Sequence, residues 1–163
     1  MQKQIVKQIL SKENMSDLPF WETKPLEKLN LTEWESLCDR CGKCCVLKLE
    51  DIDTEFVYYT DVACKMLDCK TGYCSDYAKR LEHVPDCIKL SPQSIELLPW
   101  MPKTCAYRMI YEGKKLPDWH PLISGKKDTV ALAGHSVAGK VLPESSVEEE
   151  EMADHIKNWD HPV

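Results

Sequence analysis

The chain has 163 residues, of which 43% are hydrophobic and 29% are charged, as in one globular domain with a core of its own. Its formal net charge of −6 and its few arginines speak against a phosphate-binding surface, so nucleic acid is not an expected partner. The amino terminus has no apolar run long enough for a signal peptide or a membrane span. We therefore expect no membrane partner and a cytoplasmic location.

The first residues form an appendage to the predicted domain. Aliphatic residues recur at helical spacing between lysines over residues 2–12, which predicts a short amphipathic helix. Residues 17–30 combine prolines with aromatic residues, which predicts an extended arm packed onto the body. We assign residues 1–18 to the N-terminal helix and arm, and residues 19–163 to a single cysteine-rich domain.

A helix and a hairpin flank the first cysteines. Thr32 and Glu35 have capping-box spacing, which predicts a helix that begins at Glu33 and turns Trp34 and Leu37 inward just before the first cysteine. After the cysteines, residues 46–50 alternate apolar and polar side chains. A turn at residues 51–53 then leads into residues 55–60, which are rich in aromatic and β-branched residues. This pattern predicts a β-hairpin.

The rest of the chain predicts short elements. We expect a short helical stretch near residues 77–82, a helix over residues 91–98 with proline at its first position, and a helix capped by Thr104 that runs to Gly113. Two short strands are expected over residues 129–142. A last helix, over residues 146–158, should begin with an acidic turn, which is the sign of charge favoured at a helix amino end.

Nine cysteines dominate the chemistry of the sequence. A reducing compartment does not maintain structural disulfides, and an odd count leaves one thiol unpaired even in an oxidising one. A thiolate is a strong ligand for zinc, iron or copper(I), and a two-residue gap lets two sulfurs reach one ion. The candidate metal ligands are Cys38, Cys41, Cys44, Cys45, Cys64, Cys69, Cys74, Cys87 and Cys105.

The CxxCxxCC segment, residues 38–45, has the spacing of a metal-binding knuckle at a helix end. Gly42 follows the second thiol, where a positive φ would turn backbone N–H groups toward sulfur. In a wholly helical segment the adjacent Cys44 and Cys45 would point apart. In either geometry we do not expect them to be equivalent ligands of one tetrahedral ion, which indicates two neighbouring sites or one spare thiol. Cys105 lies among apolar residues, so it is either a ligand or a core residue.

The number of thiols favours more than one ion. A closed tetrahedral zinc site uses four ligands, and eight thiols lie between Cys38 and Cys87, which allows two sites or one polynuclear cluster. The first three cysteines also have the spacing of a ferredoxin-type iron–sulfur run, whose fourth thiol comes from farther along the chain. Zinc and iron–sulfur are therefore both open.

Other roles for these residues have weaker support. A thioredoxin-like redox pair at Cys38 and Cys41 lacks the surrounding βαβ pattern. A catalytic cysteine would need a histidine base, and the sequence places none, so catalytic residues are unassigned. His120 and His135 have the most distinctive surroundings, although an ordinary loop or core histidine is the simpler interpretation for both.

Several motifs together resemble one bacterial family, the YcgN branch of the YkgJ-like CxxCxxCC proteins. The resemblance covers residues 19–142. Its motifs include Trp34 to Asp39, the CxxCxxCC segment, Pro85-Asp86-Cys87, Thr104 to Arg108 and Trp119 to Leu122. The family is described as a zinc- or iron-chelating domain with a largely unassigned role. The resemblance therefore implies metal chelation but no reaction or substrate.

The family pattern also implies a ligand set. Its broad cysteine pattern falls on Cys38, Cys41, Cys44, Cys45, Cys64, Cys74 and Cys87, while Cys105 belongs to the narrower branch. This chain departs from that branch at Gly72, where a thiol is usual, but carries Cys69 three positions earlier. Either Cys69 restores the missing ligand by a shift of the loop, or the thiol usual at position 72 is not essential for the site.

We thus expect a small single α+β domain of mainly short helices, with a β-hairpin and loops organised around a cysteine-ligated metal site. The leading hypothesis is a cytoplasmic protein that chelates zinc or an iron–sulfur cluster, for structure or for metal handling. The alternatives are an iron–sulfur enzyme or electron carrier, and a metal-stabilised adaptor for an unidentified protein partner.

Overall fold

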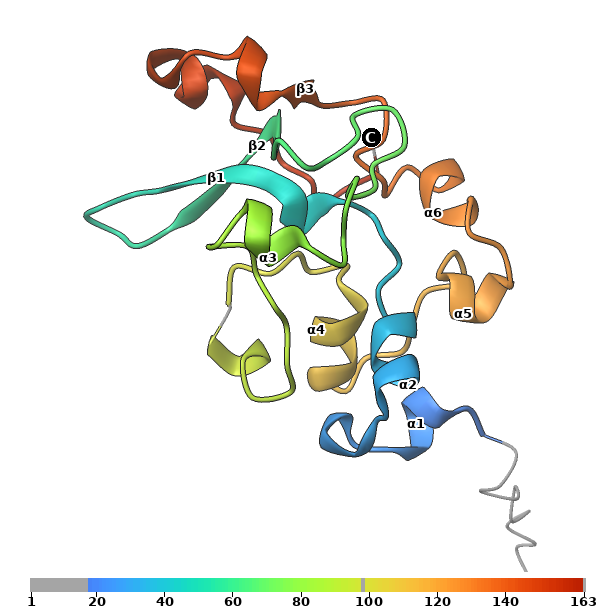
Figure 1. The fold of residues 1–163 in the computed structure, drawn as a ribbon. Helices are drawn as coiled ribbons and strands as arrows, with labels where there is room; N and C mark the ends of the chain where they lie inside the picture. The colour runs from blue at the N-terminus through green and yellow to red at the C-terminus, as the bar shows by residue number, and fades with distance from the viewer. Residues whose placement is uncertain (1–17, 98, 163) are drawn as a thin grey trace, which may run out of the picture.

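The computed structural model describes residues 18–97 and 99–162. The helix expected over residues 2–12 lies outside these residues. The described chain is a small single domain with an α+β fold, in which a three-stranded sheet lies at one end and α1, α2 and α4 lie at the other (Figure 1). The α-helices are α1 (Phe20–Thr23), α2 (Leu31–Ser36), α3 (Arg80–His83), α4 (Ala106–Tyr111), α5 (Pro121–Ser124) and α6 (Thr129–Leu132). The 3₁₀ helices are η1 (Leu26–Lys28), η2 (Lys43–Cys45), η3 (Ile95–Leu97), η4 (Glu144–Ser146) and η5 (Glu149–His155).

The sheet begins with the predicted hairpin, which is confirmed. β1 (Val46–Glu50) pairs antiparallel with β2 (Val57–Ala63), with an irregularity between Val46 and Lys48. β3 (Leu142–Pro143) adds a short parallel pairing to the end of β2, so the strand order is β1-β2-β3. A carboxylate oxygen of Asp51 accepts from the next backbone N–H groups of the turn, which closes the hairpin.

The helix before the cysteines begins two residues earlier than the sequence indicates. Asn30, rather than Thr32, is its N-cap: the Asn30 side chain accepts from the Glu33 N–H at 2.9 Å, and Glu33 accepts from the Asn30 N–H at 3.0 Å. The predicted capping box at Thr32 is therefore wrong. Asn is as good an N-cap as Ser or Thr, so two overlapping capping patterns compete in this stretch. Trp34 and Leu37 are buried, as predicted.

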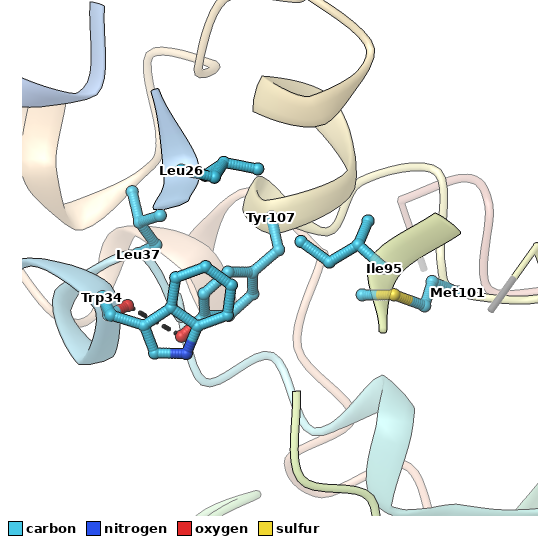
Figure 2. Packing of buried hydrophobic residues seen from close by; sticks show 6 residues of the cluster. All are labelled: Leu26, Trp34, Leu37, Ile95, Met101 and Tyr107. Carbon is cyan, nitrogen blue, oxygen red and sulfur yellow. Dashed lines mark hydrogen bonds between the residues drawn. The ribbon is translucent and has the colours of Figure 1, made fainter. Parts of the chain in front are cut away.

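One hydrophobic cluster packs the helical end of the molecule, and we call it the helical core. Figure 2 shows its buried residues Leu26, Trp34, Leu37, Ile95, Met101 and Tyr107. The Trp34 and Tyr107 rings lie 4.6 Å apart, and the Tyr107 hydroxyl donates to the Trp34 carbonyl oxygen at 2.8 Å. This contact joins α2 to α4. Phe20 and Trp21 pack against the same cluster, although their segment forms α1 and η1 instead of the expected extended arm.

A second cluster packs against the sheet, and we call it the sheet core. Its buried residues are Val46, Ala63, Leu67, Val137, Val141 and Trp159. The Trp159 indole N–H donates to the Thr60 carbonyl oxygen at 3.0 Å, and the Lys157 N–H donates to the Tyr59 carbonyl oxygen at 2.8 Å. The C-terminal segment therefore lies along β2.

The C-terminal third differs from the prediction. Residues 129–142 form α6 and a loop in place of two strands, and β3 alone is extended. Alternating small and apolar residues do not distinguish a strand from a helix and loop when the buried apolar side chains are only Val130, Val137 and Val141. The expected helix over residues 146–158 is replaced by η4 and η5. No residue of η5 is buried, so no apolar face stabilises an α-helix there.

Two further helices are shorter than expected. α4 begins at Ala106 after Cys105, with no side-chain cap, so the predicted cap by Thr104 is wrong. Residues 91–94 form a turn in which Ser91 and Ser94 exchange hydrogen bonds, and only η3 follows it. Pro99 and Pro102 lie too close to η3 for a longer helix.

Candidate metal centre

The cysteine segment, residues 38–45, connects the two cores. Leu37 at its start is fully buried in the helical core, and Val46 at its end is buried in the sheet core. In Figure 1 this connection runs from α2 to the start of β1. The segment is thus held at both ends by apolar packing.

The segment has the predicted knuckle geometry. Gly42 has a φ of 77° and precedes η2, and the Cys45 N–H donates to the Gly42 carbonyl oxygen at 2.9 Å. A Cβ atom at Gly42 would lie 2.5 Å from Val137 Cγ2, so both the backbone conformation and the packing require glycine. Asp39 steadies the turn because its Oδ1 accepts from the Cys41 N–H at 3.0 Å.

The four thiols of the segment have different surroundings. Cys41 is buried, Cys45 is half-buried, and Cys38 and Cys44 are exposed. Hydrogen bonding between the adjacent thiols lowers the pKa of Cys44 to about 7 and raises that of Cys45. The ammonium of Lys48 also stabilises the Cys44 thiolate. Cys44 is therefore the thiol of this pair that ionises first.

One group of thiols surrounds Cys41, and we call it the Cys41 group: Cys38, Cys41, Cys44 and Cys105. Burial raises the pKa of Cys41 well above its usual value, and the charge of Asp39 adds to this rise. Charges on Cys44 and Cys38 act on Cys41 in the same direction. Burial likewise raises the pKa of Cys105 to about 12, with a contribution from Cys44. Cys105 precedes α4, so this group joins α4 to the cysteine segment.

A second group lies on the sheet side, and we call it the Cys87 group: Cys45, Cys64, Cys74 and Cys87. Loss of hydration raises the pKa of Cys87 against the opposing charge of Arg80, and charges on Cys64, Cys44 and Cys74 raise it further. The Cys64 N–H donates to the Cys45 carbonyl oxygen at 2.9 Å. The charge of Cys44 acts on Cys41 and on Cys87, and thus on members of both groups.

Cys69 has a different environment. It packs half-buried against the sheet core, and its carbonyl oxygen accepts from the Gly139 N–H at 2.7 Å. It is not among the main charges that act on Cys41, Cys87, Cys105 or Lys48. At Gly72, φ is 71° and an added Cβ would lie 3.3 Å from Ala138 and Ser136. A cysteine at position 72 would therefore be strained in this loop.

Two lysines, which the sequence patterns did not single out, place positive charge beside the thiols. Lys43 is 1% exposed, and its Nζ donates to the Trp159 carbonyl oxygen at 2.7 Å and to Thr104 Oγ1 at 3.0 Å. Burial lowers its pKa, while the charges of Cys41 and Asp39 oppose that change. In the sequence, the one feature that points to a charge beside the thiols is the position of Lys43 within the CxxCxxCC segment.

Lys48 places a positive charge near the thiols of the Cys87 group. Its Nζ donates to the Cys44 and Val46 carbonyl oxygens at 2.9 Å and lies about 5 Å from the centres of the Tyr59 and Trp100 rings. Burial lowers its pKa, and charges on Cys44, Cys45, Cys64 and Cys87 oppose that change. A cation held among thiols offsets part of the negative charge that a thiolate centre carries.

The two distinctive histidines have different roles. His120 is fully buried; its Nδ1 accepts from the Leu122 N–H, and its Nε2 lies 3.0 Å from the Leu37 carbonyl oxygen. It is a fully bonded core histidine. His135 is 9% exposed and stacks on Trp119, with ring centres 4.4 Å apart. Burial lowers the pKa of His135, and the positive charge of Lys43 lowers it further.

Two buried atoms near Cys41 lack a hydrogen-bond partner. Within residues 18–97 and 99–162, the buried side-chain nitrogen and oxygen atoms without one are Asp39 Oδ2, His135 Nδ1 and Trp21 Nε1. Asp39 lies between Cys38 and Cys41. The Val137 N–H, two residues after His135, donates to the Cys41 carbonyl oxygen at 2.9 Å. Carboxylate and imidazole are both metal ligands.

Two hollows of the described chain lie away from the cysteines. One of about 570 Å³ lies between α1 and the end of α4, and one of about 830 Å³ lies beside β2 and Trp100. No cysteine is among the residues that line either hollow.

Comparison with known proteins places the chain in a family. Residues 37–106 match the CxxCxxCC family model, described as a "putative zinc- or iron-chelating domain", and this stretch contains all nine cysteines. A UPF0260 protein of Parvibaculum lavamentivorans is 53% identical over 141 residues, which cover 86% of this chain and 92% of that relative. The chain belongs to the UPF0260 family.

Other UPF0260 proteins are similar over the same extent. One from Ectopseudomonas mendocina is 53% identical over 138 residues, covering 85% of this chain and 93% of that relative. One from Shewanella pealeana is 49% identical over 142 residues, covering 87% and 96%. These matches confirm the resemblance found in the sequence, and the family model supports metal binding. We found no solved structure that matches the chain significantly.

The donor set of this UPF0260 protein fits a thiophilic metal, but the ligands are not gathered around one point. In the part of the chain that the structure describes, no three Cys, His, Asp or Glu side chains stand together closely enough to hold one ion. The fit rests on the thiol chemistry and on the unpartnered Asp39 and His135 atoms beside Cys41. An ion would therefore have to draw neighbouring side chains together, as is common when metal binding and folding are coupled. None of the described helices is long and apolar enough to cross a membrane.

Proposed function

We propose that this UPF0260 protein is a cytoplasmic metal-binding protein that holds zinc or iron through the Cys41 and Cys87 groups. The proposed ligands are Cys38, Cys41, Cys44, Cys45, Cys64, Cys74, Cys87 and Cys105. Cys69 is left out because its charge is not among those that act on Cys41, Cys87, Cys105 or Lys48. The metal is mainly structural or is held for metal handling. No protein partner enters this proposal.

The position of the cysteine segment carries the proposal. It lies between the helical core and the sheet core, and the charges of thiols from three other parts of the chain act on its own thiols or on Lys48 beside them. The stretch from Cys64 to Lys79 contains no helix or extended strand and includes only the isolated bridge between Leu67 and Cys74. Leu67 packs this stretch into the sheet core, and metal ligation would fix it to the segment at further points.

The charges near the thiols support ionised ligands. A zinc ion with four thiolates has a net charge of −2, and two such ions or a cluster would concentrate further negative charge. Lys43 lies beside Cys41, and Lys48 lies beside Cys44 and the Cys87 group. Both ammonium groups would lower the energy of a filled thiolate centre.

The metal and its form remain two alternatives within this proposal. Eight thiols in two groups suit two zinc ions, whereas the charge interaction of Cys44 with members of both groups also suits one polynuclear iron–sulfur cluster. Anaerobic purification with elemental analysis and a visible spectrum separates them. Colourless protein with stoichiometric zinc identifies the first, and brown protein with broad visible absorption identifies the second.

Single cysteine variants test the proposed ligand set. Cys41→Ser and Cys64→Ser should each release metal and lower the melting temperature, because each removes a ligand from one group. Cys69→Ser is the matched control and should retain the metal content of the unaltered protein. Full metal occupancy and unchanged melting in both Cys41→Ser and Cys64→Ser would refute the proposal.

A further inference from the structure

The two unpartnered atoms beside Cys41 belong to one small region. Asp39 is 7% exposed and His135 is 9% exposed, so water does not compensate either atom freely. The charges of Asp39 and Lys43 both act on the His135 imidazole, and the charge of Asp39 also acts on Cys41. The third unpartnered atom, Trp21 Nε1, belongs to α1 in the helical core.

One carboxylate oxygen of Asp39 accepts a backbone hydrogen bond, and the other has no hydrogen-bond partner. Its Oδ1 accepts from the Cys41 N–H, which fixes the carboxylate within the knuckle. Its Oδ2 is buried and has no donor. The nearby ammonium of Lys43 donates instead to Trp159 and Thr104. A buried carboxylate oxygen without a donor is unfavourable unless a ligand occupies its lone pairs.

The loop after α6 brings His135 to the same place. The His135 N–H donates to the Val130 carbonyl oxygen, and the Val137 N–H donates to the Cys41 carbonyl oxygen, both at 2.9 Å. The imidazole stacks on Trp119 at an interplanar angle of 24°, which sets the plane of the ring. Its Nδ1 is buried without a partner. The ring is thus positioned by contacts that leave one nitrogen unused.

We propose that Asp39 and His135 are non-thiol ligands of the ion held by Cys41, acting through Oδ2 and Nδ1. A four-coordinate ion then takes two thiolates of the Cys41 group instead of four. Imidazole nitrogen and carboxylate oxygen accompany thiolate in many zinc and iron sites. One ion between them would satisfy both unpartnered atoms together. Neighbouring thiols would have to turn toward these two atoms, because no three-ligand group is present within residues 18–97 and 99–162. This inference rests on the proposed function.

X-ray absorption at the zinc edge tests the proposal on the full-length protein loaded with Zn²⁺. We expect sulfur at about 2.3 Å together with nitrogen or oxygen at about 2.0 Å, with the multiple scattering of an imidazole. His135→Phe keeps a ring against Trp119 and should abolish the imidazole signal. Asp39→Asn keeps an oxygen that can accept from the Cys41 N–H, but it replaces the proposed ligand Oδ2 with a neutral amide NH₂ group. Each variant should bind Zn²⁺ at least about tenfold more weakly. His83→Gln, at an exposed histidine, is the control and should change neither measurement.

The outcomes separate this inference from the proposed function. All-sulfur coordination in the unaltered protein overturns the role of Asp39 and His135 and leaves metal binding intact. An imidazole signal that persists in His135→Phe overturns the assignment to His135. Protein that binds no Zn²⁺ and no iron overturns both proposals. The spectrum of the unaltered protein decides the question even where a variant fails to fold.

Discussion

The ammonium of Lys43 donates a hydrogen bond to the carbonyl oxygen of Trp159, 2.7 Å away and 116 residues farther along the chain. The same Nζ donates to Thr104 Oγ1, next to Cys105. One side chain of the CxxCxxCC segment therefore joins the cysteines, the start of α4 and the C-terminal segment that lies along β2. Through its hydrogen bonds, this residue links the candidate metal centre to the C-terminal segment.

Lys43→Met tests this connection. The variant leaves the buried Trp159 carbonyl oxygen without its donor, so we expect a loss of about 1–3 kcal/mol in the free energy of unfolding and a change in tryptophan fluorescence. Lys103→Met is the control, since Lys103 forms only an exposed ion pair with Asp160 in the same segment. It should cost no more than about 1 kcal/mol. Equal effects in urea unfolding would contradict the role of Lys43.

The packing of Gly42 predicts a marked effect of one added methyl group. Gly42→Ala must hold alanine at a φ of 77° and place Cβ 2.5 Å from Val137 Cγ2. We expect a destabilisation of about 2–5 kcal/mol, from about 1–2 kcal/mol of backbone strain and about 1–3 kcal/mol of overpacking. Gly139→Ala is the control because φ is 72° and nothing lies within 4 Å of the added atom, so only the strain applies.

Removing the clash gives a second check on Gly42. Val137→Ala in the Gly42→Ala background removes the clashing methyl groups, so this substitution should cost less there than it does in the unaltered protein. Thermal unfolding of the four proteins of this cycle measures the coupling. Strictly additive effects would show that the contact with Val137 is not what requires glycine at position 42.

Metal binding should depend on pH in a defined direction. Burial raises the pKa of Cys41, and raises that of Cys105 to about 12, so both thiols are protonated at pH 7 without metal. Ligation requires the thiolate and therefore releases protons. The apparent affinity for Zn²⁺ should rise with pH, by about tenfold per unit for each proton released.

Competition with a chromophoric chelator at pH 6, 7 and 8 measures this dependence. Calorimetry in buffers of different ionisation enthalpy counts the released protons independently. An affinity that is flat over this range would contradict ligation by protonated thiols.

The contact between α2 and α4 predicts the cost of one hydroxyl group. Tyr107→Phe keeps the ring against Trp34 but removes one of the two donors to the Trp34 carbonyl oxygen, which still accepts from the Leu37 N–H at 3.1 Å (Figure 2). We expect a loss of about 0.5–1.5 kcal/mol in the free energy of unfolding, measured by urea denaturation, because a hydrogen bond is lost without leaving the acceptor unpaired. Tyr111→Phe, at a half-exposed position on the same helix, is the control and should be nearly neutral.

Local patterns predicted the elements whose signals lie within a few residues. Alternation predicted the hairpin of β1 and β2, and helical spacing predicted that Trp34 and Leu37 point inward. The start of α2 was missed by two residues because Asn30 and Thr32 both begin a capping pattern. The predictions for residues 129–142 and 146–158 were wrong. The sequence patterns in these stretches are short and weak, so tertiary packing overrides them.

The sequence by itself determined the thiol chemistry, the CxxCxxCC spacing, the positive φ of Gly42 and the family. These properties depend on residue types and on short separations along the chain. Only the tertiary structure decided that Cys105 lies near enough for its charge to act on Cys38, that Cys69 packs against the sheet core, and that Lys43 is buried. It also brought Asp39 and His135, 96 positions apart in the sequence, close enough for the charge of Asp39 to act on the imidazole. Such neighbours arise from packing between distant segments, and no local periodicity records which segments will meet.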